Sequence, residues 1–143
     1  MAGKDYAGVR AAIDAWIDGW TFSPDNPWSL AKFEAVLDKD AVVIDDYGGE
    51  VSVLYGHKDY ASIWGPMVES SMKQWKILPE EDSIQIWIDG NIACASFILS
   101  GGGELKDGTQ ARLRQWCTFP MEKRGDRWFI LKEHITTDTA NST

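Results

Sequence analysis

The feature that most constrains the fold of this chain is the strand pattern that fills its second half, after Lys73. The segment SIQIWIDGNIACASFILS (83–100) alternates apolar and polar residues on both sides of Asp89-Gly90, a dipeptide typical of a two-residue hairpin turn. With the turn there, the isoleucines of the first strand share one dry face with the alanines, phenylalanine and leucine of the second. TQARLRQWCTFPMEK and RWFILKEHIT predict two further strands. We therefore expect four long antiparallel strands, with the glycine-rich GGGELKDG as a hairpin loop.

The first half of the chain has the spacing of helices. Apolar residues three and four apart predict one helix from Tyr6 to the segment TFSPDNP, a second over 27–37 and a third over about 57–72 that Pro66 kinks or shortens. Between the second and third, DAVVIDDY and VSVLYG predict a short hairpin turned by YGGE. No repeat or linker divides the sequence. The expected architecture is one α+β domain over 1–143, with three N-terminal helices packed on the sheet.

Charge and composition exclude several classes of partner. The net charge is −8, and lysines and arginines are scattered, so nucleic acid is a poor partner. No stretch approaches the roughly 20 apolar residues of a membrane span, and the N-terminus lacks the apolar segment of a signal peptide, which favours a cytoplasmic protein. Cys94 and Cys117 are expected to be reduced core thiols, and no histidine spacing indicates a metal site or calls for a cofactor.

The order of these elements resembles the nuclear transport factor 2-like superfamily, which includes ketosteroid isomerase, scytalone dehydratase and SnoaL-like polyketide cyclases. The likeness rests on DAVVIDDYGG, LYGHKDYASIW and the closing RLRQWCTFPMEKRGDRWFILKEHIT. It implies a cystatin-like cone, in which the helices pack on a strongly curved antiparallel sheet around an apolar pocket. It also implies a homodimer through the outer face of the sheet. The same scaffold serves enzymes and association domains alike, so the likeness alone does not select a function.

Aromatic residues are abundant in the segments that would line such a pocket, and the chain has eight tryptophans. Any one of them could equally be plain core, but the set favours a flat or hydrophobic small-molecule ligand. The aromatic candidates for the ligand site are Trp16, Trp20, Tyr55, Trp64, Trp87 and Trp116.

Asp45 is the candidate base, because the resemblance places there the carboxylate with which ketosteroid isomerase moves a proton on a steroid. Asp45 and Asp46 point to opposite faces of a regular strand, so one can enter the pocket, or both can belong to the turn DDYGG. The two oxyanion donors of the isomerase do not carry over. Ile13 stands near the position of its tyrosine, and 115–118 holds no acid where its protonated aspartate would lie.

His134 is the second candidate, because SnoaL-like relatives commonly present a histidine of the last strand to the cavity. If the preceding turn is centred on Gly125, Trp116 lies opposite His134, and Arg114 lies two residues further along; a turn of even length shifts this pairing by one. Arg114 and His134 would then suit a carbonyl, phenol or carboxylate in the pocket. Alternatively, Arg114 pairs with a surface acid and His134 bonds a neighbour.

Two functions remain open from the sequence. One is a cofactor-free isomerase, cyclase or dehydratase that uses Asp45, His134 and Arg114 on a small apolar substrate. The other is a non-catalytic ligand-binding or association domain. The two differ in whether these three side chains converge on one cavity.

Overall fold

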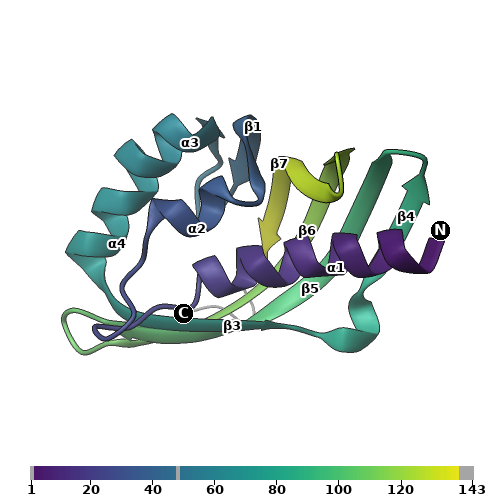
Figure 1. Ribbon diagram of the computed structural model, residues 1–143. Coiled ribbons are helices and arrows are strands. Elements are labelled where there is room, and N and C mark those ends of the chain that lie inside the picture. Colours follow the sequence, from purple (N-terminus) through teal and green to yellow (C-terminus); the bar gives the residue numbers. More distant parts are fainter. Residues whose placement is uncertain (1, 48, 139–143) are drawn as a thin grey trace.

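A curved mixed sheet forms the centre of the molecule in the computed structural model, which describes residues 2–47 and 49–138. The strand order is β2-β1-β7-β6-β5-β3, and β4 pairs with β5. Figure 1 shows this sheet with the helices gathered on one side of it. The strands are β1 (Leu37–Asp45), β2 (Ser52–Tyr55), β3 (Met72–Pro79), β4 (Gln85–Asp89), β5 (Ile92–Leu105), β6 (Gln110–Arg124) and β7 (Arg127–Thr137).

The expected α+β cone is confirmed, with two differences. The described chain from Met72 onward forms five strands where four were expected, because β3 was not predicted. The second difference is in strand direction. β1 and β7 are parallel, whereas the other paired strands are antiparallel. A parallel pair needs a long crossover connection, here everything between β1 and β7, so the local hairpin pattern could not predict it. The pairing places the ends of β1 and β7 side by side, with Asp45 opposite Ile135.

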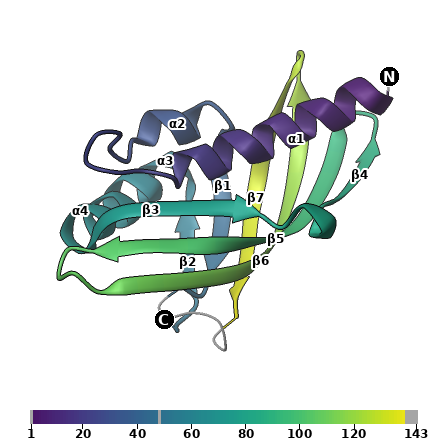
Figure 2. The same cartoon turned by 90° about the horizontal axis from the view of Figure 1, so that it is seen from below.

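The strand β5 is long enough to pair with two different strands on one edge. Its first half pairs with β4 and its second half with β3, and Figure 2 shows β5 and β6 bending across the molecule. The hairpin at Asp89 is confirmed, with Ile86 opposite Ala95 and Ile88 opposite Ala93. The expected hairpin loop over GGGELKDG is shorter than predicted. The segment 101–105 belongs to β5, and only 106–109 turns the chain.

The helices cover the concave face. They are α1 (Ala2–Gly19), α2 (Leu30–Glu34), α3 (Gly56–Asp59), the π-helical turn η1 (Tyr60–Trp64), α4 (Gly65–Ser71) and the 3-10 turn η2 (Glu81–Ser83). α2 is much shorter than the predicted 27–37, because Ser29 caps its start by accepting a hydrogen bond from Ala31 N at 3.3 Å, and Leu37 already begins β1. The third helix has its irregularity in η1, whereas Pro66 lies in the first turn of α4, where proline is tolerated.

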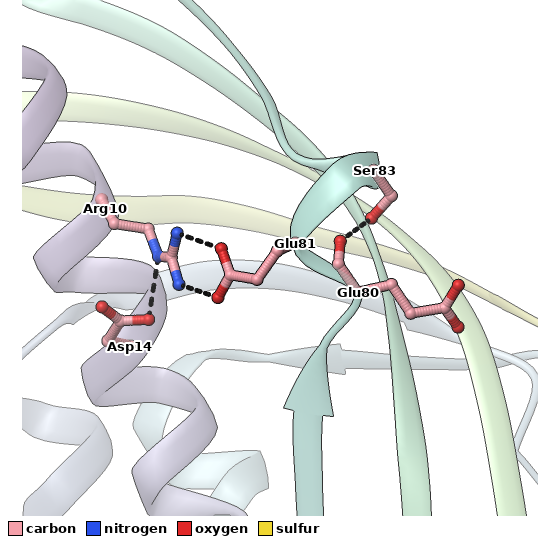
Figure 3. A network of polar contacts seen from close by, with 5 residues as sticks. All are labelled: Arg10, Asp14, Glu80, Glu81 and Ser83. Carbon is pink, nitrogen blue, oxygen red and sulfur yellow. Dashed lines mark hydrogen bonds and ion pairs between the residues drawn. The ribbon is translucent and has the colours of Figure 1, made fainter.

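Polar contacts tie α1 to the connection between β3 and β4 (Figure 3). Arg10 donates to both carboxylate oxygens of Glu81, at 2.7 and 2.9 Å, and its Nε donates to Asp14 at 3.0 Å. Ser83 Oγ donates to the carbonyl oxygen of Glu80 at 2.6 Å. On the same helix, Ile13 and Trp16 are buried in the core.

The structure also bears on the expectations about membrane spans and cysteines. None of the helices in the described part of the chain is long and apolar enough to cross a membrane. Cys94 and Cys117 are free; Cys117 is buried as expected, whereas Cys94 is only partly buried.

Candidate functional site

A cavity of about 50 Å³ lies between the helices and the concave face of the sheet. We refer to it as the cavity. Its apolar wall is mostly aromatic and sulfur-containing, and includes Trp16, Trp20, Trp64, Trp75, Met67 and Met72. Its polar lining consists of Asp45, Tyr47, Gln115 and Glu133. An apolar hollow with a few convergent polar groups is the usual form of a small-molecule site.

Glu133 is the most deeply buried charged residue of the lining, with 1% of its surface exposed. Tyr60 Oη donates a hydrogen bond to Glu133 Oε2, and Trp16 Nε1 donates to Tyr60 Oη at 3.3 Å. Burial raises the pKa of Glu133 to about 8, with a smaller rise from the charge of Asp45, while the Tyr60 hydrogen bond opposes it. Glu133 is therefore mostly protonated at neutral pH and can itself donate a hydrogen bond.

Tyr60 reaches Glu133 from the π-helical turn η1. Such turns are rare and are often found at functional sites. Tyr60 and Trp64 both face the interior from this turn, and burial raises the pKa of the Tyr60 hydroxyl further above its ordinary value of 10.0. The hydroxyl therefore keeps its proton, and the chain from Trp16 through Tyr60 holds the Glu133 carboxyl in place.

Asp45 closes β1 beside this group and is 8% exposed. Its Oδ1 accepts a hydrogen bond from Tyr47 N at 2.7 Å. Burial raises the pKa of Asp45 to about 6; the Tyr47 bond lowers it and the charge of Asp46 raises it. Asp45 is thus mostly ionised at pH 7. Asp46 is occupied elsewhere, since its Oδ1 accepts a hydrogen bond from Thr137 N at 2.7 Å.

Two buried carboxyl groups with separated pKa values therefore share one cavity. At pH 7, Asp45 is mostly a base and Glu133 mostly an acid. Groups whose environments push their pKa values apart in this way are suited to acid and base roles. Gln115 adds an amide near them, oriented by donation from its Nε2 to Thr137 Oγ1 at 2.9 Å.

The comparisons with known proteins concern structure only, because no protein-family model and no curated protein matches the sequence. A candidate aromatic ring hydroxylase from Novosphingobium aromaticivorans superposes with a TM-score of 0.79 at 14% identity, covering 96% of this chain and 90% of that one. A nuclear transport factor 2-like superfamily protein from Salmonella enterica gives 0.76 at 13% identity, covering 95% and 91%. This chain has the cystatin-like, nuclear transport factor 2-like fold.

Another solved structure has a higher sequence identity to this chain than the two above. A candidate ketosteroid isomerase from Shewanella frigidimarina is 26% identical, with a TM-score of 0.58, covering 74% of this chain and 80% of that one. The resemblance inferred from the sequence is therefore confirmed at the level of the fold.

The expectation that His134 lies buried in the pocket is wrong, because its side chain is exposed. The cause is a β-bulge in β7. Ile130 pairs with Met121 and His134 with Thr118, so four steps along β7 match three along β6. The extra residue reverses the alternation that Trp128 and Ile130 begin, which turns Glu133 inward and His134 outward.

Arg114 also lies outside the cavity. Its Nε is 2.8 Å from Glu80 Oε2, and its Nη1 is 3.8 Å from Asp138 Oδ2. Its guanidinium also stacks 4.8 Å above the ring of Trp116. The surface ion pair expected as the alternative for Arg114 is therefore the arrangement observed. Asp45, His134 and Arg114 do not converge, and only Asp45 lines the cavity.

The six aromatic candidates divide into two groups. Trp16, Trp20 and Trp64 line the cavity. The expectation is wrong for the other three, because Tyr55, Trp87 and Trp116 are 62%, 56% and 43% exposed and do not line it. Trp87 and Trp116 occupy positions of β4 and β6 whose side chains point away from the helices, since alternate residues of a strand face opposite sides.

The sequence reasoning missed Glu133, Tyr60 and Trp75. Glu133 carried a usable signal, because a carboxylate stands between Leu131 and Ile135 on an otherwise apolar strand face, where an unpaired charge is costly. Tyr60 gave no separate signal, because its spacing fits the apolar face of the third predicted helix. Within the described residues, no group of three or more histidines, cysteines, aspartates or glutamates is placed to hold a metal ion.

Proposed function

We propose that this protein binds a small, mostly apolar molecule in the cavity and moves a proton on it without a cofactor, as an isomerase, cyclase or dehydratase does. The observation that carries the proposal is the pair Asp45 and Glu133, two buried carboxyl groups of unequal pKa within one aromatic-walled cavity. His134 and Arg114 have no catalytic role in this proposal, because neither side chain lines the cavity.

The proposed chemistry suits a substrate with a carbonyl group. The Asp45 carboxylate removes a proton from the carbon beside the carbonyl, while protonated Glu133 donates a hydrogen bond to the carbonyl oxygen as negative charge develops there. A positioned base contributes roughly 10²–10⁴-fold and a buried donor roughly 10²–10³-fold to the rate. In ketosteroid isomerase, an ionised and a protonated aspartate divide the same two tasks. The likeness to a candidate ketosteroid isomerase supports the proposal.

The test is the isomerisation of 3-cyclohexen-1-one to its conjugated isomer, followed by ultraviolet absorbance. The reaction takes a proton from C2 and returns one to C4, so it needs a base and benefits from a donor at the carbonyl oxygen. We expect Asp45→Asn to lower kcat/KM at least 100-fold and Glu133→Leu at least 30-fold, on the order expected for a base and a donor. The exposed His134→Ala serves as the control, with activity within twofold of wild type.

The contrary result would be a wild-type rate in Asp45→Asn. If the wild-type protein binds the ketone but does not accelerate its isomerisation over buffer, the ligand-binding function remains and the catalytic one fails.

The alternative, an association domain, is favoured by the outer face of the sheet. The exposed Trp87 and Trp116 lie there, and strand pairing places Cys94 opposite Trp87 and Ile98 opposite Trp116 on the same face. We propose that a second copy of the chain covers this face as a homodimer, since large exposed aromatic side chains are typical of interfaces. Sedimentation at micromolar concentration should give a dimer that Trp116→Glu dissociates; a wild-type monomer would refute this. The free cysteines support a cytoplasmic location for the protein.

A further inference from the structure

We infer that the ligand of the cavity is an elongated, uncharged aromatic molecule that extends past Met72 into a neighbouring groove. The inference rests on the proposed function and adds the size and class of the substrate. The groove has a volume of about 580 Å³ and lies between the segment 22–28 and the helical segment 61–73. Its apolar lining includes Phe22, Pro27, Trp28 and Pro66.

The cavity alone is too small for a substrate of more than one ring. At about 50 Å³ it holds a few water molecules, whereas ligand pockets are typically about 300–1,000 Å³. The groove is within that range. A larger substrate that meets Asp45 and Glu133 must therefore displace part of the wall, and the adjoining groove supplies the volume that the cavity lacks.

Met72 is the part of the wall that separates the two hollows. It lines both of them and is largely buried where α4 passes into β3. The two hollows are also close at a second point, because the ring of Trp20, which lines the cavity, is 6.0 Å from the ring of Trp28, which lines the groove. A methionine side chain is unbranched and adapts to irregular neighbours. A change of its rotamer is thus the smallest movement that joins cavity and groove.

The groove favours an aromatic ligand without charge. Among the described residues, its charged lining residues are exposed and number three: Glu69, Lys73 and Lys106. Lys73 Nζ is 3.6 Å from Glu104 Oε1, and Lys106 Nζ donates to the carbonyl oxygen of Glu69.

Phenol and 4-phenylphenol test the inference, since we expect both to place a hydroxyl group against Asp45 and Glu133 and only the second to be long enough to reach the groove. Binding is measured by calorimetry. We expect 4-phenylphenol to bind at least tenfold more tightly than phenol. Ala61→Phe fills the groove from an exposed position and should weaken 4-phenylphenol at least tenfold, with phenol unchanged. The neighbouring Ser62→Phe, also exposed but outside both linings, is the matched control and should change neither.

The outcomes separate this inference from the proposed function. Equal affinities for the two phenols, or 4-phenylphenol binding that is insensitive to Ala61→Phe, overturn the extended ligand. If Asp45→Asn still weakens phenol, the cavity function stands without it. If Ala61→Phe weakens 4-phenylphenol but Asp45→Asn and Glu133→Gln weaken neither ligand, the groove binds without the carboxyl pair and the proposed function fails. As a second readout, 4-phenylphenol should shift the methyl resonance of Met72 in methyl-labelled protein; an unchanged resonance contradicts its displacement.

Discussion

The substitution Glu133→Gln measures how much the buried carboxyl group lowers the free energy of unfolding. The pKa of Glu133 is raised from an ordinary 4.5 to about 8, so over that pH range the folded chain holds a proton that the unfolded chain releases. The stabilisation from this proton is fully present below pH 4.5 and is lost as the pH rises through about 8. Each pH unit in between lowers the free energy of unfolding by about 1.4 kcal/mol, or about 5 kcal/mol over the whole range.

Glutamine has nearly the volume of glutamate and keeps an oxygen that accepts the Tyr60 hydrogen bond, but it has no proton to lose. We therefore expect Glu133→Gln to unfold at the same or slightly lower urea concentration than wild type near pH 4.5. At pH 7 the variant should be more stable by about 3 kcal/mol, and the difference should stop growing above about pH 8. The gain in stability should coincide with a loss of any activity that uses the acid.

The assay is urea unfolding between pH 4.5 and 9, followed by tryptophan fluorescence. Asp126→Asn is the control for the loss of one carboxyl group, because Asp126 is exposed in the turn between β6 and β7. A constant difference between Glu133→Gln and wild type across this range would refute the reasoning. It would mean that Glu133 has the same charge in the folded and unfolded chains.

Four further substitutions have distinct expected outcomes. Tyr60→Phe removes a hydrogen bond that lowers the pKa of Glu133, so the alkaline loss of stability should move to higher pH, with an overall cost of about 1 kcal/mol in urea unfolding; an unmoved pH profile would contradict the contact. Gly56→Ala should cost more than 3 kcal/mol, because its φ is +66° and a Cβ there would lie 1.8 Å from a carbonyl oxygen of β1. Gly90→Ala, with φ +61° and nothing within 4 Å, should cost only about 1–2 kcal/mol, and equal losses would refute the steric argument. His134→Ala should change monomer stability by less than about 0.5 kcal/mol, and a larger loss in urea unfolding would contradict its exposure.

Much of the fold follows from local patterns in the sequence. The hairpin at Asp89-Gly90, the helical stripes and the strand DAVVID are signals over a few residues, and local chemistry decides them. Asp45 faces the interior because alternation from Ala41 and Val43 continues unbroken to the end of β1. Its position at the cavity could therefore be anticipated from the strand pattern together with the resemblance.

The remainder depended on strand pairing that no local pattern contains. The parallel contact of β1 with β7 joins segments from opposite ends of the chain, and it places Asp45 near Glu133. The bulge in β7 depends on how that strand fits both neighbours, whose registers with β7 both shift in this region. Strict alternation from Trp128 and Ile130 therefore gave the wrong face for His134.

The bulge in β7 means that the number of residues in the strand, rather than their type, decides which side chain faces the cavity. Without the extra residue in the pairing, the alternation begun by Trp128 and Ile130 would continue, and His134 would slide opposite Cys117 and point inward. The segment 127–136 thus buries the carboxyl group of Glu133 in one register and would bury the imidazole of His134 in the other. Among proteins of this fold, a one-residue gap in the last strand can exchange the two without substituting any residue of the lining. Equivalent residues of the last strand therefore have to be assigned by superposing structures, because a sequence alignment alone would pair residues on opposite faces of the sheet.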